Sequence, residues 1–280
     1  MTDRAASARP GAAAGRAWAF LNGWADRVYV VSLARAADRR ARMRRRLVGL
    51  DFRFLDATDK LELDREKLRA EGMFDESRVP RAFRHRAEMV LGHLGCSMSH
   101  RRIYEEIVRN GWRRTVVLED DADPDEGALD RLPEALAQLP ATWELCYLGH
   151  LTKDGRVGRD AATPGERLRR AIYVALAPLR LVRWRTGEAL RLLPRPFSAN
   201  LGRAGRHFGT HAYAVTLEGA RKLLAAQTPV AFNADQLLAY LVLRGRLDAY
   251  VTRPVFFGQE AGASPEPGAD APPHPRSGER

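Results

Sequence analysis

The chain has 280 residues, of which 45% are apolar and 29% are charged, so its composition is that of a globular protein. This length allows one large domain or two small ones. The composition argues against a wholly disordered, collagenous or coiled-coil chain. The longest apolar run, at residues 171–178, is much shorter than the ~18 residues of a membrane-spanning helix. Basic residues number 46 against 35 acidic ones, a net charge of +11, and all but four of them are arginine. We therefore expect an acidic partner: nucleic acid, an anionic lipid surface or a phosphorylated substrate.

The two ends of the chain differ from the rest. Residues 1–24 are rich in Ala, Gly and Arg and lack the apolar stretch of a secretory signal, which predicts a flexible leader and a cytoplasmic protein. Residues 261–280 combine five prolines with Gly, Ser and charges, which predicts a disordered tail. Cys96 and Cys146 are too few for a disulfide scaffold or a four-cysteine zinc site. We expect a reducing compartment, with both thiols packed as small apolar groups.

Short apolar strands alternate with helical patterns between these ends. Val28–Leu33 reads as a first strand, the spacing of Met43, Leu47 and Leu50 predicts a helix, and residues 52–55 form a second strand. We further expect helices over residues 93–109, 217–227 and 234–244, and strands over residues 115–118, 145–148, 211–216 and 248–253. This alternation predicts an α/β domain over residues 25–260, with a mostly parallel, twisted sheet flanked by helices. Ligands bind such sheets beyond the carboxyl ends of the strands.

Residues 153–206 carry most of the surplus charge. They contain 13 basic residues against four acidic ones, and apolar residues such as Ile172, Leu179 and Trp184 lie among them. The segment therefore predicts a basic insertion in the domain, with an amphipathic element that meets an anionic surface. A solvated, Arg-rich face remains the alternative.

The strand at residues 115–118 runs into four carboxylates within five positions, Glu119, Asp120, Asp121 and Asp123. Their mutual repulsion is costly unless a cation compensates it. Mg²⁺ and Mn²⁺ prefer carboxylate and phosphate oxygens and usually share them with a substrate's phosphates. Either Glu119 with Asp121, or Asp121 with Asp123, would point to one side of an extended segment. The pattern predicts a divalent metal site.

Two other motifs could place acids at these positions. A calcium loop that starts at Asp121 needs Gly at its sixth position and Glu at its twelfth, where this chain has Glu126 and Leu132, so that loop is excluded. A capped turn stays open: Asp123 or Asp125 would start the next helix while the other acids lie in solvent.

Two further polar residues are ambiguous from spacing alone. His100 shares a helical face with Cys96 and Ile103, which favours a hydrogen-bonded packing role over a ligand role. Asp235 opens a predicted helix, as an N-cap would. The sequence has no Walker or dinucleotide Gly-rich loop and no nucleophile elbow, so the residues that carry kinase, dehydrogenase and serine-hydrolase chemistry are missing.

Seven sequence blocks between Arg27 and Gln259 together resemble the glycosyltransferase family 25 proteins of lipooligosaccharide biosynthesis. The blocks are VVSL at 30–33 with Arg35, Asp38, Arg39 and Arg40, FLDA at 54–57, LGCSMSH at 94–100, LEDDA at 118–122, YLGH at 147–150, GTHAY at 209–213 and ADQLL at 234–238. Each block is weak alone, but their common order is specific. The resemblance implies a GT-A-like fold, a UDP-hexose donor that is most often UDP-galactose, a divalent metal and inversion at the anomeric carbon.

The resemblance also implies roles for single residues. Asp121 would be the first ligand of Mn²⁺ or Mg²⁺, helped by Glu119 and Asp123. Asp235 would be the catalytic base or a residue next to the metal. The donor nucleotide would be held by Ser32, Leu33, Arg35 and Asp56, with Ser99, His100 and Asp120 beside it.

Together these features predict a metal-dependent inverting glycosyltransferase that moves a hexose, most often galactose, from UDP to a cell-envelope glycan. Its partners would be a nucleotide sugar, an anionic lipid-linked saccharide acceptor and the inner face of the cytoplasmic membrane, with no nucleic acid. Two other functions fit parts of the sequence. The Arg-rich segment could bind nucleic acid through its phosphates, and the domain could be a glycosyltransferase-like scaffold without activity.

Overall fold

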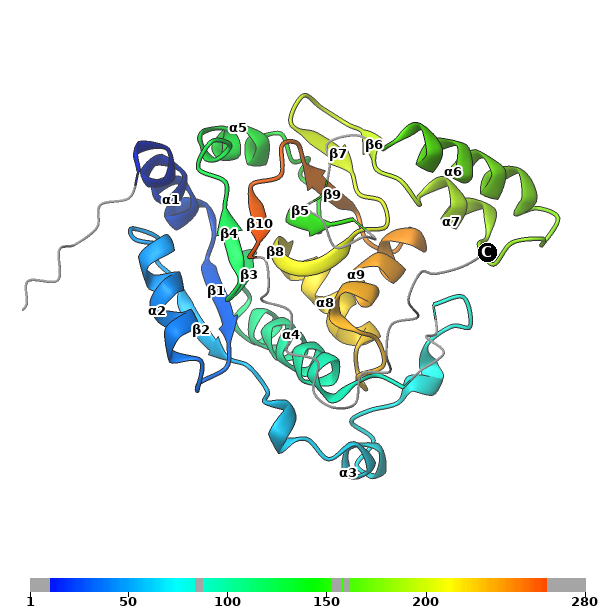
Figure 1. Ribbon diagram of the computed structural model, residues 1–280, viewed down its shortest axis with the longest axis horizontal. Coiled ribbons are helices and arrows are strands. Elements are labelled where there is room, and N and C mark those ends of the chain that lie inside the picture. Colours follow the sequence, from blue (N-terminus) through cyan, green and yellow to red (C-terminus); the bar gives the residue numbers. More distant parts are fainter. Residues whose placement is uncertain (1–10, 84–87, 153–157, 159–161, 261–280) are drawn as a thin grey trace, which may run out of the picture.

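The chain folds around one eight-stranded sheet with the strand order β2-β1-β3-β8-β5-β9-β7-β6. Figure 1 shows this fold in a computed structural model, in which residues 11–83, 88–152, 158 and 162–260 are described. The strands are β1 (Arg27–Ser32), β2 (Arg53–Asp56), β3 (Arg114–Glu119), β5 (Leu145–Leu151), β6 (Arg195–Pro196), β7 (Leu201–Arg203), β8 (Phe208–Thr216) and β9 (Ala249–Thr252). A second, two-stranded sheet pairs β4 (Ala122–Pro124) with β10 (Phe257–Gln259).

The predicted mixed α/β fold with a mostly parallel sheet is confirmed. β1 pairs in parallel with β2 and β3, and β5 with β9, while β8 lies antiparallel between β3 and β5. The pairings leave only β7 and β8 running against the other strands of this sheet. This arrangement is consistent with the GT-A-like fold that the family resemblance implies. The antiparallel direction of β8 was not predicted, because hydrophobic patterning does not give a strand's direction.

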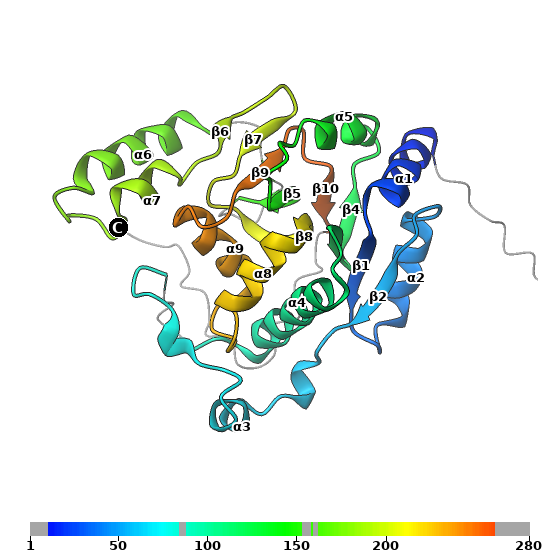
Figure 2. The same ribbon diagram turned by 180° about the vertical axis from the view of Figure 1, so that it is seen from behind.

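Helices cover both faces of the sheet (Figures 1 and 2). Alternate side chains of each strand point to opposite faces, so neighbours such as Val30 and Val31 enter different apolar cores. One face packs against α4 (Leu91–Asn110), α8 (Leu217–Ala226) and α9 (Ala234–Leu243). The other packs against α1 (Ala12–Trp24), α2 (Ala37–Arg46), the short helix η3 (Leu129–Arg131) and α5 (Leu132–Ala137). The sheet is therefore buried on both sides, as a largely parallel sheet requires.

The flexible leader predicted for residues 1–24 is wrong for residues 12–24. These residues form α1, and Trp18 and Leu21 are completely buried in the second core. The Trp18 ring lies 6.2 Å from the ring of Phe257. The prediction failed because the lack of a secretory apolar stretch does not exclude an amphipathic helix, and Ala14, Ala17, Trp18 and Leu21 form one buried helix face. Residues 1–10, and the tail predicted for residues 261–280, lie outside the described residues.

The described part of the basic segment predicted at residues 153–206 contains helices, strands and irregular turns. Its helices are α6 (Pro164–Leu176) and α7 (Thr186–Leu190), and its strands β6 and β7 extend the sheet at the β9 edge. Thr163 starts α6 with a capping box, in which its hydroxyl accepts from the Glu166 amide and Glu166 accepts from the Thr163 amide. Among the described residues, no helix has both the length and the apolar character needed to cross a bilayer.

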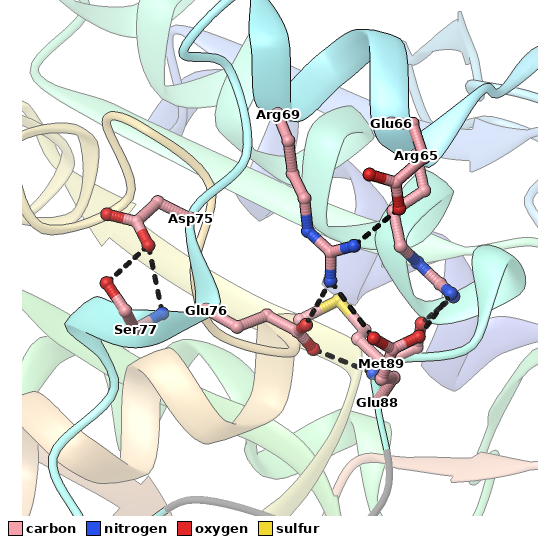
Figure 3. Close-up of polar contacts among 8 residues, drawn as sticks. All are labelled: Arg65, Glu66, Arg69, Asp75, Glu76, Ser77, Glu88 and Met89. Atoms are coloured by element: carbon pink, nitrogen blue, oxygen red, sulfur yellow. Dashed lines mark hydrogen bonds and ion pairs between the residues drawn. The ribbon is translucent and has the colours of Figure 1, made fainter.

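The chain between β2 and α4 is mostly irregular and is fastened by an ion-pair network (Figure 3). Arg69, on α3 (Arg65–Ala70), donates to Glu66 at 2.6 Å, to Glu76 at 3.1 Å and to Glu88 at 3.3 Å. Glu76 lies in the short helix η2 (Glu76–Arg78) and also accepts from the Met89 amide at 2.7 Å. The network joins α3 to the residues that lead into α4. A third short helix, η1 (Lys60–Glu62), lies between β2 and α3.

Candidate active site

A cleft of about 940 Å³ opens beyond the carboxyl ends of β1, β3 and β5. This is the edge at which ligands bind open α/β sheets. The loop after β2, the start of β8 and the start of α9 complete its walls. The residues predicted from the sequence that line this cleft are Ser32, Leu33, Arg35, Glu119, Asp120, Asp121 and Asp235.

One end of the cleft is built from β1 and the loop after β2. The Ser32 hydroxyl donates to Asp120 at 2.7 Å, and Arg39 donates to the same carboxylate at 3.1 Å. Asp120 therefore has two partners at the end of β1, and its charge is compensated within the protein. Arg35 forms a 2.5 Å ion pair with Asp59 at the rim of the cleft. This end presents backbone groups and paired charges, which suits a nucleoside better than a bare phosphate.

Ser99, on α4, holds the loop after β2 in place at this end of the cleft. Its hydroxyl accepts from the Thr58 amide at 2.9 Å and donates to the Gly95 carbonyl at 2.7 Å. A methyl group on Gly95 would approach the Thr58 carbonyl to 2.6 Å, so α4 packs directly against the loop that carries Thr58. Ser99 and Gly95 do not line the cleft; they position the Thr58 loop, which does.

In the middle of the cleft, the half-buried Glu119 pairs with His100, which is buried beneath it. The Nε2 atom of His100 lies 3.3 Å from Glu119, and its Nδ1 atom lies 2.8 Å from the Tyr213 hydroxyl. Thr210 donates a short hydrogen bond to Glu119. Burial alone would raise the pKa of Glu119, but the hydrogen bonds and charge of its partners outweigh it and the pKa is lowered. Glu119 is thus held as a carboxylate at the edge of the cleft.

The sulfur of Cys96 completes a cluster with His100 and Glu119, whose potential ligand atoms all lie within 4.8 Å of one another. Both nitrogens of His100 already have partners, and burial raises the pKa of the Cys96 thiol well above its ordinary value. A protonated thiol is a poor metal ligand. We therefore interpret this cluster as packing and hydrogen bonding, the role that spacing favoured for His100.

Asp121 differs from its acidic neighbours because one of its oxygens is buried without a hydrogen-bond partner. Gln259 donates to Oδ2 at 2.8 Å, while Oδ1 is buried without a hydrogen bond. Burial, Glu119 and Asp120 together raise the pKa of Asp121 to about 7, and the Gln259 hydrogen bond offsets this only in part. A buried carboxylate oxygen without a partner, next to a second carboxylate, is suited to a hard divalent cation. Asp121 and Glu119 therefore fit the predicted metal site.

Two predicted site residues lie away from the cleft. β3 ends at Glu119 and the chain turns at Asp120 and Asp121 before β4 begins, so the strand alternation that placed Asp123 beside Asp121 does not continue. Asp123 is exposed and lies 3.4 Å from Arg46. Asp56 is exposed at the end of β2 and pairs with Arg40. The structure does not bring either residue to the acidic centre.

The capped-turn alternative fits only one of the acids. Asp125 accepts from the Gly127 amide at 3.0 Å and so caps the turn that follows β4. Asp120 and Asp121, by contrast, are buried rather than solvated. The acidic cluster therefore cannot be explained as a solvated turn.

Asp235 and Arg206 lie at the other end of the cleft. Asp235 is in the first turn of α9, a favourable place for a negative charge, and accepts a 3.5 Å contact from the Gly209 amide. The Arg206 guanidinium lies 4.9 Å from the centre of the Phe208 ring and 5.5 Å from that of Trp184. Burial and the nearby Arg183 lower the pKa of Arg206, and Asp235 opposes this shift.

Sequence reasoning missed several of these residues. Arg206 belongs to a segment full of arginines, and the sequence does not show that it lines the cleft. Thr210 lies within the GTHAY block but gives no chemical signal of its own. Gln259 reaches Asp121 across 138 positions of the chain. No local pattern could have identified that contact.

Three histidines lie close together next to this end of the cleft. The His150 and His207 rings are 4.2 Å apart, and His211 Nε2 lies 3.2 Å from the Phe257 carbonyl. Burial, with a smaller effect of His211, lowers the pKa of His150 to about 4. Burial also lowers the pKa of His207 far below its ordinary value. These side chains are neutral at pH 7 and pack as uncharged aromatic groups.

Comparison with known proteins connects this site to a family. The profile described as Glycosyltransferase family 25 (LPS biosynthesis protein) matches residues 25–154. The inactive glycosyltransferase 25 family member 3 of Homo sapiens is 32% identical over 207 residues, 72% of this chain and 29% of that protein. Its counterpart in Mus musculus is 31% identical over 249 residues, 82% of this chain and 36% of that protein. Procollagen galactosyltransferase 2 of Homo sapiens is 26% identical over 208 residues, 72% of this chain and 28% of that protein.

The chain spans about a third of the length of these relatives. The profile match begins just before β1 and ends after β5, so it includes Ser32, the Thr58 loop, α4 and the acidic cluster from Glu119 to Asp121. The similarity in sequence and the geometry of the cleft therefore concern the same residues. On these grounds the chain belongs to glycosyltransferase family 25.

Proposed function

We propose that this protein is a metal-dependent, inverting glycosyltransferase that transfers a hexose from a UDP-sugar to a glycan acceptor. The observation that carries this proposal is the buried Asp121 carboxylate, which has an unpartnered oxygen beside Glu119 in the middle of the cleft. The cleft offers a nucleoside end at Ser32 and a base, Asp235, at the opposite end. The acidic centre lies between them, as the diphosphate of a nucleotide sugar requires.

Each part of the cleft has a chemical task in this reaction. Asp121 and Glu119 would hold Mn²⁺ or Mg²⁺, which supplies Lewis-acid neutralisation of the departing diphosphate. Asp235 would accept the proton of the acceptor hydroxyl while the oxygen of that hydroxyl forms a bond to the anomeric carbon. The bond from that carbon to the UDP oxygen breaks in the same displacement, and the configuration inverts.

The proposal of galactose and of an envelope glycan rests on the names of related proteins and on Arg206. Procollagen galactosyltransferase 2 is named for galactose transfer, and the family description names LPS biosynthesis. Arg206 supports an acceptor with a phosphate or carboxylate, because its stacked guanidinium lies near Asp235, where the acceptor would bind. We therefore place UDP-galactose and an anionic, lipid-linked saccharide first among the candidates.

A panel of UDP-sugars tests the proposal. We expect one UDP-hexose to release UDP in the presence of Mn²⁺, and a chelator to stop the release. The variant Asp235→Asn should lower turnover on the order of 10²- to 10⁴-fold while donor binding persists. The matched control Asp123→Asn removes an acid outside the cleft and should leave turnover unchanged. Failure of UDP to bind with Mn²⁺ would refute the proposal.

An inactive scaffold is a second candidate, because two of the relatives described above carry "inactive" in their names. A scaffold of this kind would bind UDP and Mn²⁺ and raise the melting temperature of the protein, but release no UDP from any donor. Turnover with one donor would exclude it. The retained pair of Asp121 and Asp235 in one cleft favours the active enzyme.

A further inference from the structure

Helix α6 has apolar side chains on two sides. Tyr173 and Val174 pack against the core of the domain, and Ala177 is buried just after the helix ends. This inner side attaches α6 to the molecule beside α7. Figures 1 and 2 show α6 at the margin of the molecule, at the end opposite α1 and α2.

The other side of α6 is apolar and faces solvent. Leu168 is 64% exposed and Ile172 is 46% exposed. Ala171 and Ala175 are also exposed and lie at helical spacing from these two residues. In the turns that follow the helix, Leu179 and Leu181 are 66% and 67% exposed. We define the α6 outer face as Leu168, Ala171, Ile172, Ala175, Leu179 and Leu181. Several large exposed apolar side chains on one helix and in the turns after it favour an interaction site.

The charge around this face is positive and lacks local compensation by acids. The only acids of residues 162–190 are Glu166 and Glu188. Glu166 is used in the capping box of α6, and Glu188 is buried against Arg244. The arginines of the same stretch are Arg167, Arg169, Arg170, Arg180, Arg183 and Arg185. A partner that meets the α6 outer face must therefore be apolar in part and negatively charged.

We propose that the α6 outer face docks on an anionic lipid membrane. A lipid bilayer offers hydrocarbon and negative phosphates within a few ångströms of each other, and a helix with apolar and Arg-rich sides lies in that interface. The leucines and Ile172 would enter the headgroup region, while Arg167 and Arg169 meet lipid phosphates. Membrane docking requires no sugar transfer, so it goes beyond the proposed function and is tested separately from it.

The docked face is also connected to the acceptor end of the cleft. The Arg183 guanidinium lies 4.4 Å from the centre of the Trp184 ring, which is buried, and Arg206 contacts the same ring from within the cleft. The exposed arginine and the cleft arginine thus share one aromatic side chain. Docking would hold the acceptor end of the cleft beside the surface that carries a lipid-linked saccharide.

Sedimentation with vesicles tests the proposal on the full chain. We expect the protein to bind vesicles of phosphatidylcholine with phosphatidylglycerol, and to bind phosphatidylcholine alone much more weakly. The variant Leu168→Ser/Ile172→Ser should lose at least tenfold in partition coefficient. Arg167→Gln/Arg169→Gln should lose roughly 25-fold, because each of the two arginines near an anionic surface contributes roughly fivefold. High salt should weaken binding of the wild type.

Matched variants elsewhere on the molecule serve as controls. Leu61→Ser removes a leucine that is 76% exposed, and Arg45→Gln/Arg53→Gln removes two exposed arginines near the opposite end of the molecule. Both should bind vesicles as the wild type does. Because the Leu168 and Ile172 side chains are exposed, circular dichroism and melting temperature should be unchanged in the test variant.

Three results would overturn the proposal. Equal binding to neutral and anionic vesicles would remove the charge argument. Absence of vesicle binding, together with concentration-dependent dimers that Leu168→Ser/Ile172→Ser abolishes, would assign the face to a second copy of the chain. Absence of vesicle binding, together with salt-sensitive RNA binding lost in Arg167→Gln/Arg169→Gln, would assign it to nucleic acid.

Discussion

Replacing Asp121 by Asn should stabilise the metal-free protein and abolish its response to Mn²⁺. The Asp121 carboxylate is buried, has one oxygen without a hydrogen bond and lies near two other acids. Its negative charge is therefore unfavourable until a cation is bound. The amide of Asn removes that charge and can still accept the hydrogen bond from Gln259.

The size of the effect follows from the pKa of Asp121. In the unfolded chain this carboxyl loses its proton near its ordinary pKa of 3.8, but in the folded protein it keeps the proton up to about pH 7. Stability of the metal-free protein therefore falls as the pH rises between these values, by up to about 4 kcal/mol at pH 7.5. Asp121→Asn should recover about 2 to 4 kcal/mol of this loss, which corresponds to a rise in melting temperature of roughly 5 to 15 °C.

Differential scanning calorimetry at pH 7.5, with chelator and then with Mn²⁺ and UDP, measures both halves of the prediction. The wild type should gain stability when Mn²⁺ and UDP are added, whereas Asp121→Asn should start higher and gain little. Asp123→Asn, which removes an exposed acid paired with Arg46, should match the wild type in both conditions. A lower melting temperature of Asp121→Asn in chelator, or an undiminished response to Mn²⁺, would refute the reasoning.

Three other predictions concern different parts of the molecule. Trp18→Ala should cost about 3 to 5 kcal/mol of unfolding free energy in a denaturant titration, because that ring is fully buried; no loss would mean that α1 does not pack on the sheet. His150 takes up a proton near pH 6.5 in the unfolded chain but only near pH 4 in the folded protein. The free energy of unfolding should therefore fall by about 2 kcal/mol between pH 7 and pH 5, and the fall should be correspondingly smaller in His150→Gln. An unchanged fall would contradict this assignment. Arg206→Gln should raise the KM for a phosphorylated acceptor at least tenfold without changing Mn²⁺-dependent UDP release from the donor alone; an unchanged KM would remove Arg206 from the acceptor site.

The order of strands and helices could be predicted because each element has a clear period and clear ends. The helix expected at residues 93–109 is α4, and Gly111 ends it in the left-handed conformation that glycine adopts easily. The strands expected at residues 28–33, 52–55 and 115–118 are β1, β2 and β3, each within two residues. The antiparallel direction of β8 could not be predicted, because it depends on which neighbours a strand finds.

The sequence predicted the part of the site whose residues are neighbours in the chain, but not the contacts that distant residues make with them. Glu119, Asp120 and Asp121 follow one strand, so the position of the strand end places all three at the cleft. Their different environments come from distant residues: Ser32 and Arg39 contact Asp120, and Gln259 contacts Asp121. Asp123 was misplaced because alternation holds within a strand and fails at the turn after β3.

The central claim is that Asp121 makes the cleft a site for a divalent cation and a nucleoside diphosphate. Isothermal titration of the protein with Mn²⁺, in the presence of saturating UDP, tests this claim most directly. We predict one Mn²⁺ site per chain in the wild type and in Asp123→Asn, and no such site in Asp121→Asn. Equal Mn²⁺ binding by Asp121→Asn and the wild type, or no Mn²⁺ binding by either, would contradict it.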